Sequence, residues 1–215
     1  MNKKTLVVAA TYEEVMPVFT HFGWLEASFV NQTDFDVLLT GVGMTATAFA
    51  LGQHLNEDYG LVLNVGIAGT FDSTIELGSL VNITEDTFSE LGAEDGDRFL
   101  AIDDLGFGKA VYKSNFTSEN KLISDLKVVN GITVNTVHGH AGHISRIQER
   151  MNVKTESMEG AAVFYACEQL NIPVLQVRSI SNYITQRNKE NWKVGLAITN
   201  LNDWLINYLN TNFAL

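Results

Sequence analysis

Three polar side chains stand beside apolar segments in an arrangement that suits chemistry on a small molecule. Glu14 and Asn182 each follow an apolar run, and Glu159 stands at the start of another. Carboxylates can activate water or accept hydrogen bonds from hydroxyl groups, and an amide can donate as well as accept. The stretch Gly66-Ile67-Ala68-Gly69 closes a further apolar run, and its glycines let a flat ligand approach the backbone. These segments predict a small-molecule site with two carboxylates and an amide.

The elements that must position these residues alternate between strands and helices. Short β-branched apolar runs, typical of strands buried on both faces, predict strands at 5–10, 35–40, 61–67, 80–84, 132–137 and 174–180. Apolar residues spaced three and four apart predict helices over about 14–22, 43–56, 158–170 and 194–208. The alternation predicts one α/β domain spanning 1–215, with a central mixed, mostly parallel sheet flanked by helices. Ligands of such sheets bind beyond the carboxyl ends of the strands, where the polar segments lie.

The charge balance excludes several classes of partner. The 215 residues include 25 acidic and 14 basic side chains, for a formal net charge of −11. Because like charges repel and no basic stripe is present, we expect neither nucleic acid nor an anionic membrane as a partner. Eight of the acids fall within 85–104, which lacks a clear period, so we expect a solvated excursion there.

The cysteine content and the apolar segments of the sequence predict a cytoplasmic protein. Cys167 is the single cysteine, which rules out an intramolecular disulfide and suits a reducing compartment. The apolar run 5–10 is too short for a signal peptide and is followed at once by acids. The uncharged stretch 37–55 is interrupted by Thr40-Gly41-Val42-Gly43, which fits a strand and a helix better than a membrane span of about 20 apolar residues.

Five stretches resemble motifs of one superfamily. They read AATYEEV, LLTGVGMTATA, LVLNVGIAGTFDSTIELGSLV, ESMEGAAVFYACE and VRSISNY, and they look like the nucleoside phosphorylase/nucleosidase superfamily over most of the chain, least over 85–135. The hydrolase branch that includes methylthioadenosine/S-adenosylhomocysteine nucleosidases is the nearer relative. Ser-Ile-Ser-Asn, Arg187 and Trp192 look most like the futalosine hydrolases of the alternative menaquinone pathway. The resemblance implies a homodimeric enzyme without cofactor or metal that hydrolyses the N-glycosidic bond of a purine nucleoside.

The same resemblance implies roles for individual residues. Glu14 is similar to the carboxylate that activates water at the anomeric carbon. Glu159, beside Met158, is similar to the carboxylate that accepts hydrogen bonds from the ribose hydroxyls, and Asn182 occupies the position that contacts the purine leaving group. The expected catalytic residues are therefore Glu14 and Asn182. The expected substrate-binding residues are Ile67, Ala68, Gly69, Met158, Glu159, Asn182 and Arg187.

Asn182 carries the inference about the base. Adenine-cleaving relatives typically have Asp at this position, whereas an amide is always neutral and its NH2 group can donate to N7 or O6. A mismatched buried donor or acceptor costs roughly 1–3 kcal/mol. The amide therefore favours a 6-oxopurine, which releases hypoxanthine, over methylthioadenosine. It also removes the usual proton donor, so hydrogen bonding, another residue or water must activate the leaving base.

Other functions stay open at this stage. A phosphorylase needs cations near the anomeric carbon, and neither 10–14 nor 65–70 contains an arginine, so water is the expected nucleophile. A methylthioadenosine-type nucleosidase and a purine nucleoside phosphorylase remain enzyme alternatives. A purine-binding protein that keeps the fold without catalysis is the alternative from another class.

Each site residue also has a structural interpretation. Glu14 could complete a capping box with Thr11, although Pro17 favours a helix that begins nearer Glu14 or is kinked. Glu159 could complement a helix dipole, which is worth roughly 0.3–1 kcal/mol, and Asn182 could be a turn residue.

The histidines and the late arginine are equally ambiguous. His138, His140 and His143 lack the spacing and the nearby cysteine of a strong metal motif, so we expect them in a loop near the substrate or at the surface. Arg187 could form a structural cation–π pair with Trp192. It could instead bind a substrate carboxylate through two hydrogen bonds.

Overall fold

The computed structural model describes residues 3–213 and is built on one large sheet. The strands are β1 (Lys4–Ala9), β2 (Phe29–Asn31), β3 (Phe35–Leu39), β4 (Tyr59–Thr70), β5 (Leu80–Phe88), β6 (Gly92–Asp95), β7 (Arg98–Ala101), β8 (Val111–Lys113), β9 (Lys127–Thr133), β10 (Thr155–Ser157) and β11 (Val174–Tyr183). The strand order in the large sheet is β10-β9-β5-β11-β4-β1-β3-β2, with β8 paired to β5, and β6 and β7 form a separate two-stranded sheet. The central strands β3, β1, β4 and β11 are parallel, whereas β5 is antiparallel to β11. The predicted α/β class with a mixed, mostly parallel sheet is confirmed.

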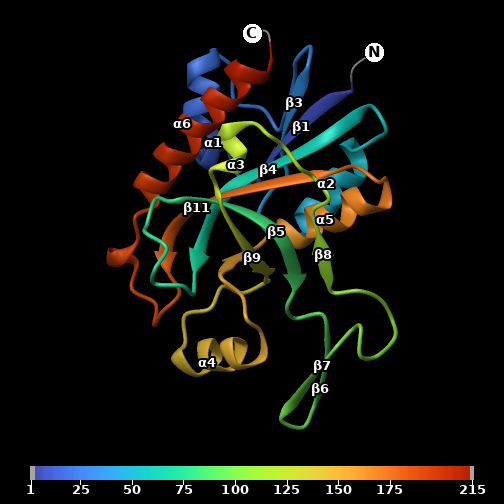
Figure 1. Ribbon diagram of the computed structural model, residues 1–215, viewed down its shortest axis with the longest axis vertical. Helices are drawn as coiled ribbons and strands as arrows, with labels where there is room; N and C mark the ends of the chain where they lie inside the picture. Colours follow the sequence, from blue (N-terminus) through green and yellow to red (C-terminus); the bar gives the residue numbers. More distant parts are fainter. Residues whose placement is uncertain (1–2, 214–215) are drawn as a thin grey trace.

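Helices cover both faces of this sheet. They are α1 (Tyr12–Phe22), α2 (Met44–His54), α3 (Lys121–Ser124), α4 (Ala141–Arg150), α5 (Gly160–Gln169) and α6 (Val194–Asn212). Helix α1 packs against α6 on one side, and α2 packs against α5 on the other (Figure 1). Helix α4 and the β6–β7 hairpin lie together at one end of the molecule, away from these layers.

The alternation of side chains along β1 explains why both faces need helices. Val7 and Ala9 contribute to the apolar cluster under α1 and α6, whereas Leu6 and Val8 contribute to the cluster under α2 and α5. Successive strand residues point to opposite faces, and all four are at most 1% exposed. Each buried aliphatic side chain contributes about 1.5–3 kcal/mol, so the continuous apolar run forms a central strand.

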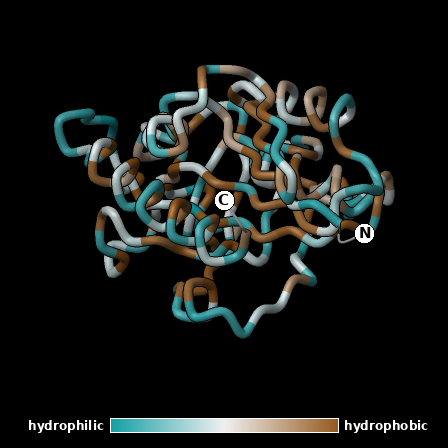
Figure 2. The backbone as a smooth tube through the Cα atoms, turned by 90° about the horizontal axis from the view of Figure 1, so that it is seen from above, coloured by the Kyte–Doolittle hydropathy of each residue, from teal (hydrophilic) through white to brown (hydrophobic). Residues whose placement is uncertain are grey.

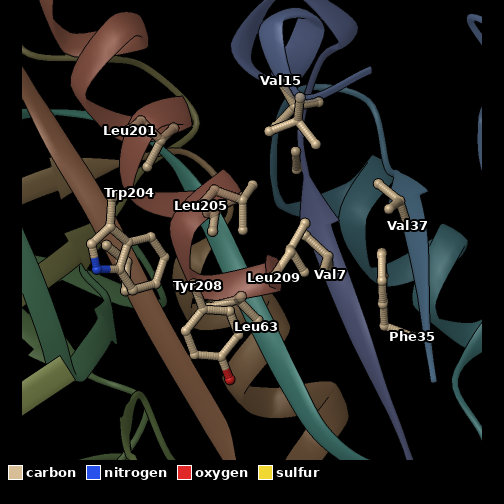
Figure 3. Packing of buried hydrophobic residues seen from close by; sticks show 14 of the residues in the cluster. Val7, Val15, Phe35, Val37, Leu63, Leu201, Trp204, Leu205, Tyr208 and Leu209 are labelled. Carbon is tan, nitrogen blue, oxygen red and sulfur yellow. The ribbon is translucent and has the colours of Figure 1, made fainter. Parts of the chain in front are cut away.

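The interface of α6 with the sheet shows how the first cluster is filled. Leu201, Leu205 and Leu209 recur at helical spacing on α6 and face the side chains of β1 and β4, Val7 and Leu63 (Figure 3). Apolar stretches run through the middle of the molecule, and hydrophilic stretches occupy its outer loops (Figure 2). The helices therefore fix the sheet, and the sheet in turn fixes the residues at its edge.

Several expected boundaries were wrong. The acidic stretch 85–104 is not a continuous excursion, because β5 extends to Phe88 and residues 92–101 form the β6–β7 hairpin. The strand expected at 132–137 is β9, which ends at Thr133. Helix α4 and strand β10 were not predicted, since α4 is polar on most of its surface and β10 has only three residues. None of the helices within residues 3–213 combines the length and apolar character that crossing a membrane requires.

Candidate active site

The candidate site lies where the carboxyl ends of parallel strands meet. Strands β1, β4 and β11 are parallel neighbours, so the residues that close them lie at one edge of the sheet. Strand β10 pairs with the last residues of β4 and brings Glu159, two residues beyond its end, to the same edge. Topology therefore brings together residues as far apart in the chain as Glu14 and Asn182, which are 168 positions apart.

Glu14 is fixed by two backbone N–H groups. Its side chain is buried, Oε1 accepts from the N–H of Ile67 at 2.9 Å, and Oε2 accepts from the N–H of Thr11 at 3.2 Å. The second bond is the carboxylate half of a capping box, so Glu14 caps α1 and also faces the site. Of the two alternatives expected for Pro17, a helix start nearer Glu14 was wrong, because α1 begins at Tyr12 and contains Pro17.

A buried arginine that the sequence analysis missed lies between the two carboxylates. Arg178 is 1% exposed, and its Nη2 lies 3.8 Å from Oε2 of Glu159. Its guanidinium and the carboxylate of Glu14 both lie over Gly66, where an added Cβ would overlap the guanidinium and lie 2.8 Å from Glu14 Oε1. A charged residue inside the apolar run 174–180 was the signal available in the sequence, because a buried charge needs a partner.

Glu159 stands directly before α5 without capping it. The side chain of Glu159 makes no capping bond to α5, and Oε1 instead accepts from the N–H of Gly43 at 3.1 Å, just before α2. The carboxylate is buried and faces Arg178. A purely local capping role is therefore excluded, although the dipole of α5 still favours a negative charge there.

Burial dominates the protonation of Glu14. Desolvation raises the pKa of Glu14 above its ordinary value of 4.5, and the charge of Glu159 raises it further. Arg178 and the hydrogen bonds from Ile67 and Thr11 oppose this shift. Within residues 3–213, Glu159 is the carboxylate that lies within 4 Å of the guanidinium, whereas the charge of Arg178 acts on Glu14 and Asp86 from a greater distance. A carboxylate whose pKa is raised towards neutrality is suited to act as a general base.

A chain of buried side chains holds Arg178 from behind. Asn64 Oδ1 accepts from Arg178 Nη2 at 3.5 Å, and Asn64 Nδ2 donates to Gln176 Oε1 at 2.7 Å. Gln176 Nε2 then donates to Asp86 Oδ2 at 2.7 Å, and Thr133 donates to the other oxygen of Asp86 at 2.9 Å. Burial raises the pKa of Asp86 to about 6. Asp86 was assigned to the solvated stretch 85–104, which the structure corrects: its side chain is fully buried.

The amide of Asn182 has a defined orientation at the end of β11. Asn182 Nδ2 donates to the carbonyl of Tyr183 at 3.3 Å, and the hydroxyl of Ser181 lies 2.8 Å from Asn182 Oδ1 and 3.2 Å from the carbonyl of Ala68. An ideal Cβ on Gly69 would lie only 3.2 Å from that Nδ2 and 2.8 Å from Cγ1 of Ile184. Glycine at 69 therefore leaves the NH2 group of Asn182 accessible, in the orientation expected for donation to a ligand.

The remaining expected contact residues divide into two groups. Ile67 presents its N–H to Glu14, Ala68 is buried beside it, and Met158 is half-buried directly before Glu159. Arg187 lies apart, in the exposed segment between β11 and α6. Its guanidinium is 5.2 Å from the ring centre of Trp192, and its N–H donates to the carbonyl of Gly139 at 3.1 Å.

The three histidines do not gather around one point. His138 pairs with Glu156 through its ring Nδ1 and its backbone N–H, whereas His140 and His143 pack against each other at a ring distance of 4.8 Å near the start of α4. Across residues 3–213, no three His, Cys, Asp or Glu side chains are placed to hold a metal ion.

The side chains at this edge include the chemical groups that N-glycosidic bond cleavage needs. Such a reaction needs a base for the nucleophile, a group for the ribose hydroxyls and donors for the departing base. Glu14, Glu159 and Asn182 are side chains of these chemical types and lie around one edge of the sheet. Arg178 offsets the charge of the two carboxylates.

Comparison with known proteins places this architecture in a family. The family model described as Phosphorylase superfamily matches residues 10–207. A futalosine hydrolase from Streptomyces coelicolor is 32% identical over 178 residues, which cover 79% of this chain and 76% of that protein. The structure reported as native futalosine hydrolase of Helicobacter pylori matches with a TM-score of 0.81 at 16% identity, over 98% of this chain and 99% of that one.

A nucleosidase structure shares the fold to the same degree. The methylthioadenosine/S-adenosylhomocysteine nucleosidase from Helicobacter pylori, bound to butyl-thio-DADMe-Immucillin-A, matches with a TM-score of 0.82 at 16% identity, over 97% of this chain and 98% of that one. At that identity the likeness concerns the fold alone. The fold and the matched model define the class, and the chain belongs to the phosphorylase superfamily. Within the superfamily it belongs with the futalosine hydrolases, as the 32% identity with the Streptomyces enzyme shows.

Proposed function

We propose that this protein hydrolyses the N-glycosidic bond of futalosine, releasing hypoxanthine and the modified ribose in the futalosine route to menaquinone. The observation that carries the proposal is the pair Glu14 and Glu159 around Arg178, next to the oriented amide of Asn182. The relatives named futalosine hydrolase supply the substrate class.

Water is the proposed nucleophile, and Glu14 is its base. The C–N bond breaks with its electron pair leaving on the purine, and the water oxygen bonds to the anomeric carbon while Glu14 takes a proton from the water. That proton is returned through solvent to the purine, which leaves as neutral hypoxanthine. The raised pKa of Glu14 brings the basicity of the carboxylate closer to the working pH. Glu159 accepts hydrogen bonds from the ribose hydroxyls, where positive charge develops on the sugar in the transition state.

Phosphate is disfavoured although the site contains an arginine. The positive charge of Arg178 is already offset by the neighbouring carboxylates of Glu159 and Glu14, so it is not free to bind a phosphate. A phosphorylase would need a cation that is not already shared in this way. Segments 10–14 and 65–70 contain no arginine, but Arg178 lies outside both of them.

Asn182 is proposed to bind the departing purine. The NH2 group of Asn182 lies over Gly69 and donates one hydrogen to the carbonyl of Tyr183, so its second hydrogen is proposed to donate to O6 or N7 of the base. Ile67, Ala68, Gly69 and Met158 complete the proposed contact surface. Arg187 is proposed to leave Trp192 and bind the carboxylate of the substrate's 5′ extension.

The proposal includes a homodimer in the cytoplasm. Phe49, which is 68% exposed on α2, and Val42, which is 56% exposed just before it, form an apolar surface that a second copy would cover. The single cysteine, Cys167, is a buried free thiol, which suits a reducing compartment. Size-exclusion chromatography with light scattering tests the dimer, and a Phe49→Glu variant that stays dimeric would contradict this surface.

The test of the function is base release in phosphate-free buffer. Futalosine, inosine and methylthioadenosine are incubated in parallel, and hypoxanthine and adenine are separated by chromatography. We expect hypoxanthine from futalosine. Adenine from methylthioadenosine alone would instead indicate a methylthioadenosine-type nucleosidase, activity only with added phosphate a phosphorylase, and no release a binding protein.

A further inference from the structure

Glu156 is a buried carboxylate that the mechanism above does not use, and it lies in line with Asn182. In the sheet, Asn182 of β11 is the partner of Gly69 on β4, and Glu156 of β10 is the partner of the same glycine from the other side. Gly69 is therefore the middle of a row of three residues across three adjacent strands.

The side chains of this row project to one face. Directly opposed residues of an antiparallel pair point to the same side of the sheet, so Glu156 lies on the side to which a Cβ of Gly69 would point. That Cβ would lie 3.2 Å from Asn182 Nδ2, so the amide lies on this side as well. Two strand spacings separate the flanking backbones by about 10 Å, and the glycine between them carries no side chain.

The carboxylate of Glu156 is held in place by one residue. The backbone N–H of His138 donates to Oε1 at 2.9 Å, and Nδ1–H of the same residue donates to Oε2. Glu156 is only 4% exposed. A carboxylate has about four acceptor positions, so two remain for a ligand. The hydrogen bond to Glu156 raises the pKa of His138, which favours its charged form beside the carboxylate.

We propose that Glu156 reads the base by accepting the N1–H of a 6-oxopurine, beside Asn182, which donates to the oxygen at C6 or to N7. The proposal rests on the proposed function, because it identifies the base that the same site holds. His138 is a positioning residue that orients the carboxylate from the side opposite the ligand.

The chemistry of the two purine classes explains the discrimination. A 6-oxopurine presents a donor at N1 and an acceptor at C6, which complements an acceptor at Glu156 and a donor at Asn182. A 6-aminopurine presents the reverse pattern, with an acceptor at N1 and a donor at C6. The acceptor Glu156 would then face the acceptor N1, and the donor Asn182 would face the donor amino group at C6. This mismatch is expected to lower kcat/KM for the 6-aminopurine at least about tenfold.

The test compares Glu156→Gln with the matched control Glu149→Gln, which removes an exposed carboxylate on α4. kcat/KM is measured for futalosine and for its 6-aminopurine counterpart. The glutamine side chain can either accept from N1–H or donate to N1, so we expect the preference for the 6-oxopurine to fall at least about tenfold, with the control unchanged. An unchanged preference in a folded Glu156→Gln protein would overturn the proposal.

Binding of free bases to the unmodified protein provides the second measurement. Calorimetry compares hypoxanthine with 1-methylhypoxanthine and adenine, and we expect both analogues to bind at least about tenfold more weakly. Equal binding of hypoxanthine and adenine would overturn the proposal, whether or not futalosine is turned over. Absence of turnover with preserved hypoxanthine binding would instead contradict the proposed function and leave Glu156 as the reader of the base.

The positioning role of His138 has its own readout. His138→Ala should lower the preference for the 6-oxopurine, mainly through KM of the 6-oxopurine, and His138→Asn, whose amide can donate to the carboxylate, should restore part of it. A loss of kcat for both purine classes to the same extent, with no rescue by asparagine, would show a structural role only.

Discussion

The side-chain amide of Asn202 on α6 bridges two backbone groups of α1 on either side of Pro17, the carbonyl of Glu14 and the N–H of Val18. Asn202 Nδ2 donates to the backbone carbonyl of Glu14 at 2.8 Å, and Asn202 Oδ1 accepts from the N–H of Val18 at 3.2 Å. In a regular helix the N–H of Val18 would bond to the carbonyl of Glu14 directly. Pro17 lies between them, and a proline inside a helix kinks it. The inserted amide therefore satisfies both groups and ties the proposed base to α6.

This bridge predicts a specific coupling between Pro17 and Asn202. Asn202→Ala leaves a buried donor and a buried acceptor without partners, which should lower the free energy of unfolding by about 1–3 kcal/mol for each group and also lower kcat. In a Pro17→Ala background the helix can close its own bond, so the same substitution should cost less. Urea unfolding of the four proteins measures the difference. Equal costs in both backgrounds would show that the amide does not compensate for the proline.

Replacement of the proposed base tests the mechanism directly. Glu14→Gln keeps an oxygen for the N–H of Ile67 but removes the proton acceptor, so kcat should fall by about 10²–10⁴-fold. Binding of a non-hydrolysable futalosine analogue, followed by calorimetry, should persist. The control is Glu13→Gln, because the adjacent Glu13 is exposed and should tolerate the change. Unchanged turnover of the Glu14 variant would remove it from the mechanism.

The pH dependence of activity should follow the same carboxylate. Burial raises the pKa of Glu14 above 4.5, so kcat/KM should rise with pH through an acid limb displaced above that value. The effect of Glu14 on stability has the opposite pH dependence. Because the pKa of Glu14 is higher in the folded protein than in the unfolded chain, this group stabilises the fold fully below about pH 4.5. This contribution is lost as the pH rises through the folded-state pKa. Activity lost on acidification is therefore not explained by this group unfolding the protein. Asp86, with a pKa of about 6, also titrates in this range, and the limb should survive in Asp86→Asn.

The identity of residue 182 should set the preference between bases. Asn182→Asp replaces a fixed NH2 donor with a group that accepts when ionised, which repels an oxygen at C6 and suits an amino group. We expect the ratio of kcat/KM for futalosine over its 6-aminopurine counterpart to fall at least about tenfold. Parallel progress curves with the two nucleosides measure it. A ratio equal to that of the unmodified enzyme would contradict the assignment of the amide.

The central sheet was predictable because its strands carry their own signal. Residues Leu6 to Ala9 and Leu61 to Leu63 are apolar on both faces, and this pattern belongs to strands covered by helices on both sides. The hairpin at 92–101 and helix α4 carry polar sequences. Their positions depend on tertiary contacts that a local pattern does not contain.

The site was predictable where a residue follows a recognisable strand, as Glu14 and Asn182 do. Arg178 was missed because it stands inside a strand, where the apolar neighbours dominate the pattern. Asp86 was hidden in an acidic stretch, and only the paired strands show that it is buried beside Gln176. The partners of the buried charges of Arg178 and Asp86 come from other segments of the chain, so they can be identified only once the sheet is assembled.

Gly66 is predicted to be irreplaceable because Arg178 and Glu14 use the space above it. An added Cβ would overlap the guanidinium and lie 2.8 Å from Glu14 Oε1, so the buried ion cluster would have to move. Gly66→Ala should lower the free energy of unfolding by about 1–3 kcal/mol, and displacement of the base by about 1 Å should lower kcat about 10²-fold. The control is Gly52→Ala in α2, where a Cβ meets nothing within 4 Å and should be neutral or stabilise by up to about 1 kcal/mol. Thermal unfolding and futalosine turnover of both variants measure these effects, and full activity of Gly66→Ala would disprove the close approach.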